Sequence, residues 1–233
     1  MRPAPDRLIR QLPARAGVAI GYVVALIATT LLFRGLPADG RRAWLAWTST
    51  NLENLGDHPL RSLVVSGLFS DGGLVGWALT AAVGLGVTNW ALGNWRTAAL
   101  IAGAHVGGTL ISQGILAYRI AGGQAPVGDR SIVDVGPSYV VACALVAGAL
   151  YGLGAQRLPA VVCFGLFAPN AFLGLPTLQV ASVGHLCAVV FAVAVGWPLW
   201  RSGRPRVADP SPGSGAGTAS APVVSRSRLG LLR

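Results

Sequence analysis

The chain has 233 residues, of which 53% are apolar and only 11% charged, and it contains 32 glycines. Soluble domains carry about 25% charged residues, so this composition excludes an ordinary soluble protein and indicates a membrane protein. The net charge of +10 does not indicate a nucleic-acid partner, because the arginines lie in short linkers and tails rather than on one continuous face.

Six apolar stretches are long enough to cross a bilayer, which takes about 20 residues. In chain order they are 16–33, 74–90, 97–118, 132–153, 158–175 and 178–200, with a shorter apolar segment at 63–69 before the second. The first stretch is long and has no cleavage site in front of a soluble domain, so we interpret it as a retained anchor rather than a signal peptide. The expected fold class is an all-α membrane protein with six transmembrane helices.

Arginine placement sets the expected orientation, because arginine-rich linkers stay on the cytoplasmic side. With the N-terminus inside and six crossings, the inner side holds twelve arginines against two acidic residues, and the outer side holds six against six. Five or seven spans would leave the C-terminal arginines outside. We therefore expect a plasma-membrane protein with both termini in the cytoplasm.

The same assignment divides the chain into three parts. A short cytoplasmic segment (1–15) precedes the membrane domain (16–201), and the remainder (202–233) is rich in Pro, Gly and Ser and is expected to be a disordered cytoplasmic tail. The long connection after the first span is expected outside. It carries Trp44 and Trp47 on one helical face, and tryptophan prefers the headgroup zone, so this pattern predicts a helix lying in the outer interface.

Two polar side chains within the expected spans have complementary chemistry. Ser138 would lie about six residues into the fourth span and His185 about seven into the sixth, so both would lie ~9–10 Å below the outer boundary. An imidazole that accepts the hydroxyl proton makes a serine nucleophilic toward a carbonyl. Gly136 would leave room beside the serine, and Gly184 would let the sixth span approach the fourth closely.

Purely structural roles also explain these residues. A serine near a helix start often caps the helix or bonds to the preceding turn, and Pro137 is typical of a first helical turn. A histidine in the bilayer can simply bond to a neighbouring helix. That interpretation is favoured for His105 in the third span, and a polar network with Ser112 or Gln113 is its alternative.

With these residues identified, the sequence resembles the rhomboid family of intramembrane serine proteases. The resemblance covers most of the membrane domain, and it rests on Gly136-x-Ser138 opening the fourth span, Gly184-His185 in the sixth, and the long outer loop. The signature Asp134-x-Gly136-x-Ser138 is similar to that of the rhomboid-like membrane proteins common in actinobacteria. The implied fold is a six-span rhomboid-like bundle with an interfacial helix in its first outer loop.

The resemblance implies that Ser138 is the nucleophile and His185 the general base of a dyad without a carboxylate. Its partners would be membrane lipid and transmembrane protein substrates, cut near the outer leaflet. Asp134 lies one turn before the serine, where we expect it to cap the span or to meet an outer-loop arginine such as Arg130.

Departures from the family pattern leave a second function open. Active rhomboids usually place a His and an Asn on the second span as oxyanion donors, and a rough alignment puts Gly76 and Thr80 there. Only Thr80 carries a donor, and losing one donor typically lowers the rate 10²–10³-fold. Tyr139 also stands where a small residue is usual. The alternative is an inactive rhomboid-like pseudoprotease that binds or chaperones transmembrane segments.

Other classes of function have little support in the sequence. A transporter or channel usually carries buried acidic residues or arginines within its spans, and we expect no span here to bury one. No cofactor or metal is expected, because no phosphate-binding glycine loop or ligand cluster is present. Cys143, Cys163 and Cys187 lack metal-site spacing and fit small buried apolar side chains.

Overall fold

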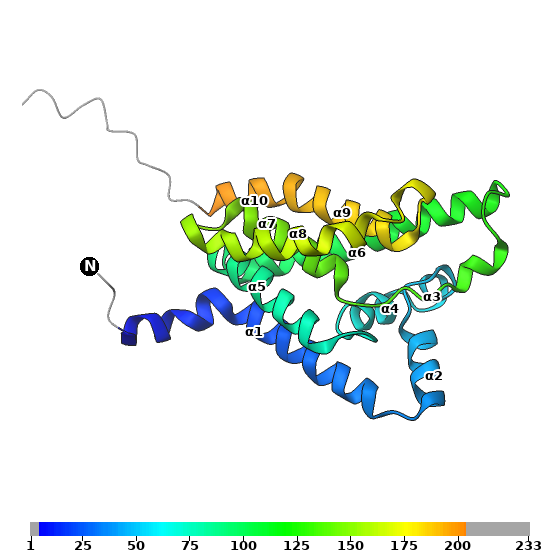
Figure 1. Cartoon of the computed structure of the whole chain (residues 1–233), viewed down its shortest axis with the longest axis horizontal. Coiled ribbons are helices and arrows are strands. Elements are labelled where there is room, and N and C mark those ends of the chain that lie inside the picture. The colour runs from blue at the N-terminus through cyan, green and yellow to red at the C-terminus, as the bar shows by residue number, and fades with distance from the viewer. Residues whose placement is uncertain (1–4, 204–233) are drawn as a thin grey trace, which may run out of the picture. The chain divides into compact units, whose positions relative to one another are not determined.

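The computed structural model describes residues 5–203, with side chains from residue 15 onward. The α-helices in this part of the chain are α1 (Pro5–Gly35), α2 (Ala38–Thr48), α3 (Leu52–Asp57), α4 (Pro59–Ser66), α5 (Leu74–Leu92), α6 (Asn94–Ala121), α7 (Ser138–Tyr151), α8 (Leu158–Phe172), α9 (Val180–Ala194) and α10 (Gly196–Ser202) (Figure 1). Short 3-10 helices, η1 (Val127–Ser131), η2 (Gly154–Arg157) and η3 (Leu175–Thr177), lie in the connections. Nearly all of the predicted tail lies outside the described residues.

Five helical stretches within the described residues are long and apolar enough to cross a membrane. They run over Arg15–Gly35, Leu74–Leu92, Asn94–Ala121, Gly154–Thr177 and Val180–Ser202. Each coincides with one of the six apolar runs of the sequence, and the third is longer at both ends than predicted. The predicted all-α membrane fold is confirmed at this level.

The fourth predicted span is shorter than expected, because its helix begins at Ser138, six residues later than predicted. The residues before it bond to distant segments instead: the Thr50 N–H donates to the Asp134 carbonyl (2.9 Å), and the Gly136 N–H donates to the Ser66 carbonyl (2.8 Å). Gly136 has a φ of +127°, which a non-glycine residue rarely adopts. At 14 residues α7 falls short of the ~20 that span the hydrocarbon core, so the six-span count stays a prediction.

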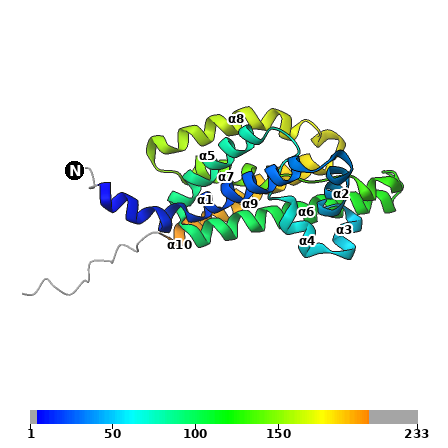
Figure 2. The same ribbon diagram turned by 90° about the horizontal axis from the view of Figure 1, so that it is seen from below.

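Helix α7 forms the centre of the bundle. It packs against α5, α6, α8 and α9, which surround it in Figure 2. Residues 139–148 are all buried, as expected for a helix that is apolar on every side. At Gly84 of α5, a Cβ would lie 3.0 Å from the backbone nitrogen of Leu145, so the glycine lets α5 approach α7 closely.

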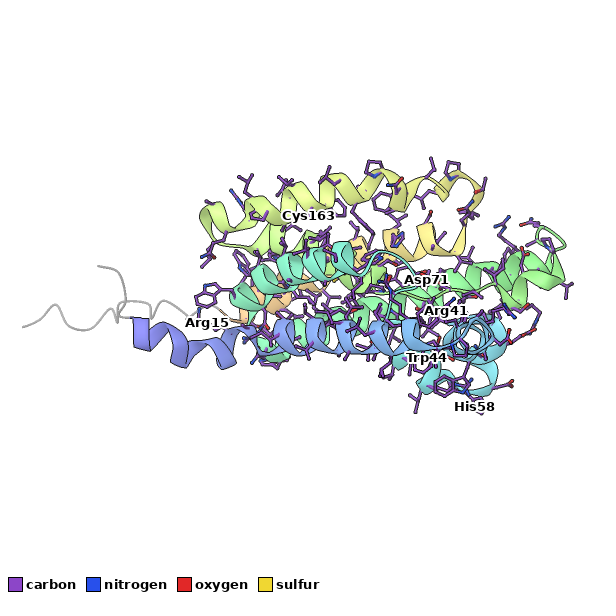
Figure 3. The ribbon with its side chains drawn as sticks, turned by 60° about the horizontal axis from the view of Figure 1, so that its bottom comes forward. Arg15, Arg41, Trp44, His58, Asp71 and Cys163 are labelled. Carbon is purple, nitrogen blue, oxygen red and sulfur yellow. The ribbon has the colours of Figure 1, made fainter. Side chains whose placement is uncertain are left out.

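Helices α2, α3 and α4 gather at the end of the bundle where α1 finishes (Figure 1). Figure 3 shows Arg41, Trp44 and His58 at this end and Arg15 at the opposite end of the membrane-spanning part of α1. Trp44 and Trp47 lie on one face of α2, with ring centroids 6.0 Å apart. The helix predicted around the two tryptophans is therefore present, and its position in the outer interface stays a prediction.

The non-helical turn that follows α4 has its carbonyl groups satisfied by donors on α1. Tyr22 donates to the Gly67 carbonyl, and Thr29 donates to the Leu68 carbonyl. Each unsatisfied carbonyl would cost several kcal/mol in hydrocarbon. These bonds therefore allow α4 to end inside the bundle, close to the start of α7.

Candidate functional site

His185 lies in α9, buried to 7% exposure, with one of its ring nitrogens hydrogen-bonded. Its Nδ1 lies 3.0 Å from the carbonyl oxygen of Ala171 at the end of α8. A carbonyl oxygen only accepts, so Nδ1 carries the proton and Nε2 carries the lone pair. Nε2 is buried and has no hydrogen-bond partner within the described residues. The imidazole is therefore held in the tautomer that a general base requires.

Two aromatic rings cover the His185 imidazole. Tyr139 of α7 and Phe167 of α8 each meet it edge to face, with centroids 5.2 Å away and interplanar angles of 83°. The Tyr139 side chain is buried, at 3% exposure. The side chain of α7 that meets the imidazole is thus the tyrosine next to the predicted nucleophile.

Ser138 is the first residue of α7 and is half-buried. Among residues 15–203, no hydrogen bond joins its hydroxyl to His185. Consecutive helical residues point about 100° apart, so the Tyr139 position that faces α9 turns Ser138 toward a different neighbour. The structure brings the start of α7 and the middle of α9 to the same level without pairing the two side chains, and the catalytic roles of Ser138 and His185 stay predictions.

Gly184 and Gly136 serve contacts other than a serine pocket. A Cβ at Gly184 would overlap the Tyr139 ring, so this glycine makes room for the tyrosine between α7 and α9. Gly136 has open space where a Cβ would lie, and its N–H is used by the bond to Ser66. The supporting roles expected for both glycines beside a catalytic dyad stay predictions.

Asp134 neither caps α7 nor pairs with an arginine, so the role expected for it from the sequence is corrected. Its carboxylate accepts hydrogen bonds from Thr50 (3.1 Å) and from the Tyr139 hydroxyl (3.3 Å). The only ion pair among the described residues joins Arg42 and Asp39. Asp134 faces inward because its backbone is bonded to Ser49 and Thr50, between α2 and α3.

Burial raises the pKa of Asp134 above its ordinary value, and hydrogen bonds from Thr50 and Tyr139 offset this only in part. The Gln113 side-chain amide is also near this carboxyl, but it is buried without a hydrogen-bond partner. A cavity of about 550 Å³ lined by Arg119, Asp129 and Asp134 separates this carboxyl from the start of α9. Asp134 thus lies between the Tyr139 hydroxyl and a cavity that Arg119 and Asp129 also line.

The two positions aligned with the family's oxyanion donors face a groove between α5 and α8. Gly76 and Thr80 line it together with Trp77 and Phe167, and its volume is about 320 Å³. The Thr80 hydroxyl donates to the Gly76 carbonyl one turn earlier (2.8 Å), so it is already occupied. The Trp77 and Phe167 ring centroids lie 6.1 Å apart, so the aromatic pair separates the groove from His185.

His105 joins α6 to α4, as the favoured interpretation of the sequence expects. Its Nε2 lies 2.9 Å from the Leu63 carbonyl and 3.3 Å from the Ser66 hydroxyl. Because the carbonyl can only accept, Nε2 carries the proton and cannot take one from Ser66. This second serine–histidine contact is therefore structural. No sequence signal identified Ser66, because its partner lies 39 positions away.

Some contacts of the site were not visible in the sequence. The chain carried no sign that Thr50 would meet Asp134, which lies 84 positions later. Tyr139 was noticed only as a bulky residue beside the serine. Within the described residues, no group of three or more His, Cys, Asp or Glu side chains is placed to hold a metal ion.

The apolar helices that enclose α7 define a multi-pass helical membrane protein. Its candidate polar site is His185, whose tautomer is fixed by the Ala171 carbonyl and whose ring is covered by Tyr139 and Phe167. The sequence profile of the rhomboid-like protein family matches residues 10–206, and the chain belongs to that family. No curated protein and no solved structure matches the chain.

Proposed function

We propose that this rhomboid-like protein binds transmembrane segments of other membrane proteins without hydrolysing them. The observation that carries the proposal is the edge-to-face contact between Tyr139 and His185, while no hydrogen bond joins Ser138 to His185 among the described residues. The oxyanion donors usual on the second span are also replaced, since Gly76 has no side chain and the Thr80 hydroxyl is used within its own helix.

The groove between α5 and α8 is the binding surface that we infer for such segments. Small residues let helix backbones approach closely in a bilayer, and Gly73 and Gly76 supply them here. A transmembrane helix would lie along this groove with its side chains against Leu166, which is 75% exposed. In this proposal the protein crosses the plasma membrane six times and has both termini in the cytoplasm.

Co-purification of single-span reporter proteins with the full-length protein tests the proposal. Gly76→Phe fills the groove and is expected to reduce reporter recovery about tenfold. Val75→Phe is the matched control, because Val75 is 71% exposed and does not line the groove. Ser138→Ala is expected to leave recovery unchanged, and equal recovery with both phenylalanine variants would contradict the proposal.

Proteolysis is the second candidate, and the state of His185 favours it. The Ala171 carbonyl fixes the proton on Nδ1 and leaves Nε2 without a partner, ready to accept a hydroxyl proton. A dyad would form if the Tyr139 ring moved aside and Ser138 turned toward α9. Ser138 would then attack a peptide carbonyl near the outer leaflet, and His185 would pass the proton to the leaving amine.

A fluorophosphonate probe and a panel of transmembrane reporters distinguish the two candidates. For the binding protein we expect neither labelling nor cleavage. Labelling and cleavage that are both lost in Ser138→Ala, but kept in the exposed-loop control Ser131→Ala, would establish the protease and overturn the binding-only proposal.

A further inference from the structure

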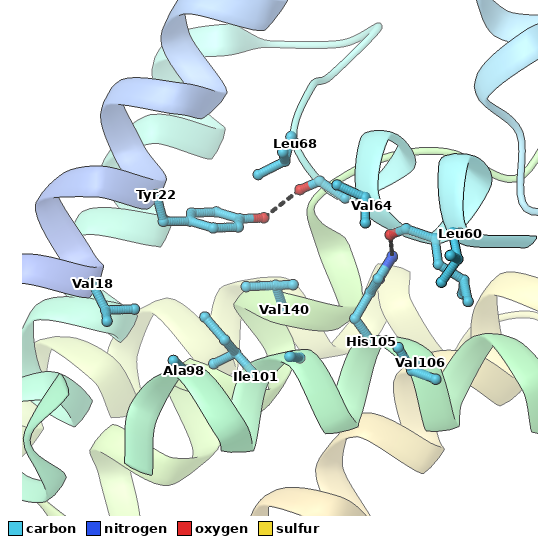
Figure 4. A pocket seen from close by; sticks show the side chains of 13 residues that line it. Val18, Tyr22, Leu60, Val64, Leu68, Ala98, Ile101, His105, Val106 and Val140 are labelled. Atoms are coloured by element: carbon cyan, nitrogen blue, oxygen red, sulfur yellow. Dashed lines mark hydrogen bonds between the residues drawn. The ribbon is translucent and has the colours of Figure 1, made fainter. Parts of the chain in front are cut away.

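An apolar slot lies between α1, α4 and α6, away from the groove described above. Its volume is about 350 Å³, and Figure 4 shows the side chains that line it. Val18 and Ala98 mark the end at which α1 and α6 begin their membrane-spanning parts, and Leu60 and Val106 mark the other end. Val140 of α7 closes its floor.

The two polar side chains at the slot use their donors on backbone carbonyls, and the second His105 ring nitrogen, Nδ1, is buried out of reach of an occupant. Tyr22 donates to the Gly67 carbonyl, and the His105 Nε2 donates to the Leu63 carbonyl (Figure 4). The remaining lining residues are aliphatic. An occupant must therefore be hydrocarbon.

The length and lining of the slot fit an unbranched hydrocarbon chain. From Ala98 to Val106 the slot follows eight residues of α6, which span ~12 Å at 1.5 Å per residue. An extended acyl chain can follow that length in contact with α1, α4 and α6, whereas a helix about 10 Å across could insert only its side chains.

An arginine stands where the headgroup of such a lipid would lie. Arg15 precedes Val18 by three residues, so the two share one face of α1 at the open end of the slot. Arg15 lies over the Trp90 ring, 5.7 Å from its centroid, and forms no ion pair with any described residue. Tryptophan marks the headgroup zone, and arginine matches phosphate oxygens in charge and geometry.

We propose that this slot binds one acyl chain of a membrane phospholipid whose phosphate lies against Arg15. The lipid comes from the leaflet on the side where α1 begins. It fills the space between α1 and α6 and so completes the packing around α4. The proposal does not depend on catalysis or on client binding.

Native mass spectrometry of the purified full-length protein, released gently from detergent, tests the proposal. The wild type is expected to retain one phospholipid. Ala98→Phe fills the slot and is expected to lower retention about tenfold, whereas Ala99→Phe, on the exposed neighbouring face of α6, retains the lipid. Arg15→Gln is expected to weaken retention of an anionic phospholipid about fivefold.

Equal lipid retention by Ala98→Phe and Ala99→Phe would overturn the proposal, as would a bound protein segment that Ala98→Phe displaces. Thermal unfolding of both variants checks that they fold. A phospholipid with a photoreactive group at mid-chain gives a readout on the unaltered protein. Cross-links are expected on residues 98–106 of α6, and cross-links spread evenly over the exposed face of α8 would contradict the assignment.

Discussion

Tyr139 determines the geometry of the candidate site. Its ring fills the space between α7 and α9, its hydroxyl meets Asp134, and its edge-to-face contact covers His185. The contact depends on Gly184, because any larger residue there would overlap the ring. One tyrosine and one glycine thus decide which side chain of α7 faces the histidine.

Replacing Gly184 with alanine tests this pairing. The added methyl group would overlap the Tyr139 ring, so we expect a loss of about 1–3 kcal/mol in the free energy of unfolding. Unfolding in mixed detergent micelles measures it. Combining the change with Tyr139→Leu should recover part of the loss. Gly165→Ala is the control, because a Cβ at Gly165 meets open space.

The carboxyl of Asp134 makes a pH-dependent contribution to stability. Its native pKa is raised above the ordinary 3.8, with burial as the main cause. Below the ordinary pKa both states are protonated and the contribution is fully present. As the pH rises, the unfolded state ionises first, so stability falls until the pH passes the native pKa.

The difference in unfolding free energy between wild type and Asp134→Asn measures this effect. The advantage of the wild type should decrease as the pH is raised from about 4 upward. Asp57→Asn, at an exposed position, is the matched control. A difference that is constant with pH, or that grows with it, would contradict the assignment.

At the scale of elements, the long helices could be predicted because a bilayer of known thickness requires long apolar runs. The start of α7 could not be predicted, because it depends on contacts with distant segments. Runs of about 20 apolar residues have few alternatives in a bilayer, so α1, α5, α6, α8 and α9 match the sequence closely. The start of α7 was predicted six residues too early, because the groups that bond to the irregular segment before it come from Thr50 and Ser66. No local pattern reports such partners.

The candidate site was likewise predictable only in part. The spacing of residues along the predicted spans placed the start of α7 at the same depth as His185. It could not tell whether Ser138 or Tyr139 faces α9, because adjacent positions differ by about 100° of rotation and both stretches are apolar. The choice is made by packing against Gly184.

The hydrogen bond from His105 of α6 to the Leu63 carbonyl of α4 gives a prediction for these elements. His105→Leu removes the donor to the Leu63 carbonyl, and a buried carbonyl left without a partner costs about 1–3 kcal/mol. We expect faster amide hydrogen exchange in residues 63–68 than in the wild type. Thr80→Val, whose hydroxyl bonds only within α5, should leave that segment protected, and unchanged exchange in His105→Leu would contradict the role of the histidine.

At the scale of the whole molecule, charged residues mark both ends of the bundle. Arg15 lies at one end, and Arg41, His58 and Asp71 lie at the other (Figure 3). The arginine-rich linkers of the sequence predict that the Arg15 end faces the cytoplasm. This predicted orientation rests on charge and does not depend on the candidate site.

Cysteine labelling on intact cells tests the orientation. In a background without Cys163 and Cys187, which are partly accessible, a membrane-impermeant maleimide should label His58→Cys. Gln156→Cys, exposed in the linker after α7, should react only after permeabilisation. The reverse pattern would invert the topology, and labelling of both sites in intact cells would contradict the odd number of crossings predicted between them.

The bonds between α1 and the turn after α4 have a consequence for biogenesis. Tyr22, Thr29 and Arg34 all donate to carbonyls between residues 67 and 72. Because α1 leaves the ribosome first, its donors are already in the bilayer when this turn arrives. A chain without α1 would have to place this turn in the membrane with carbonyls that lack hydrogen-bond donors. The presence of α1 in the bilayer therefore favours insertion of the segment that follows it.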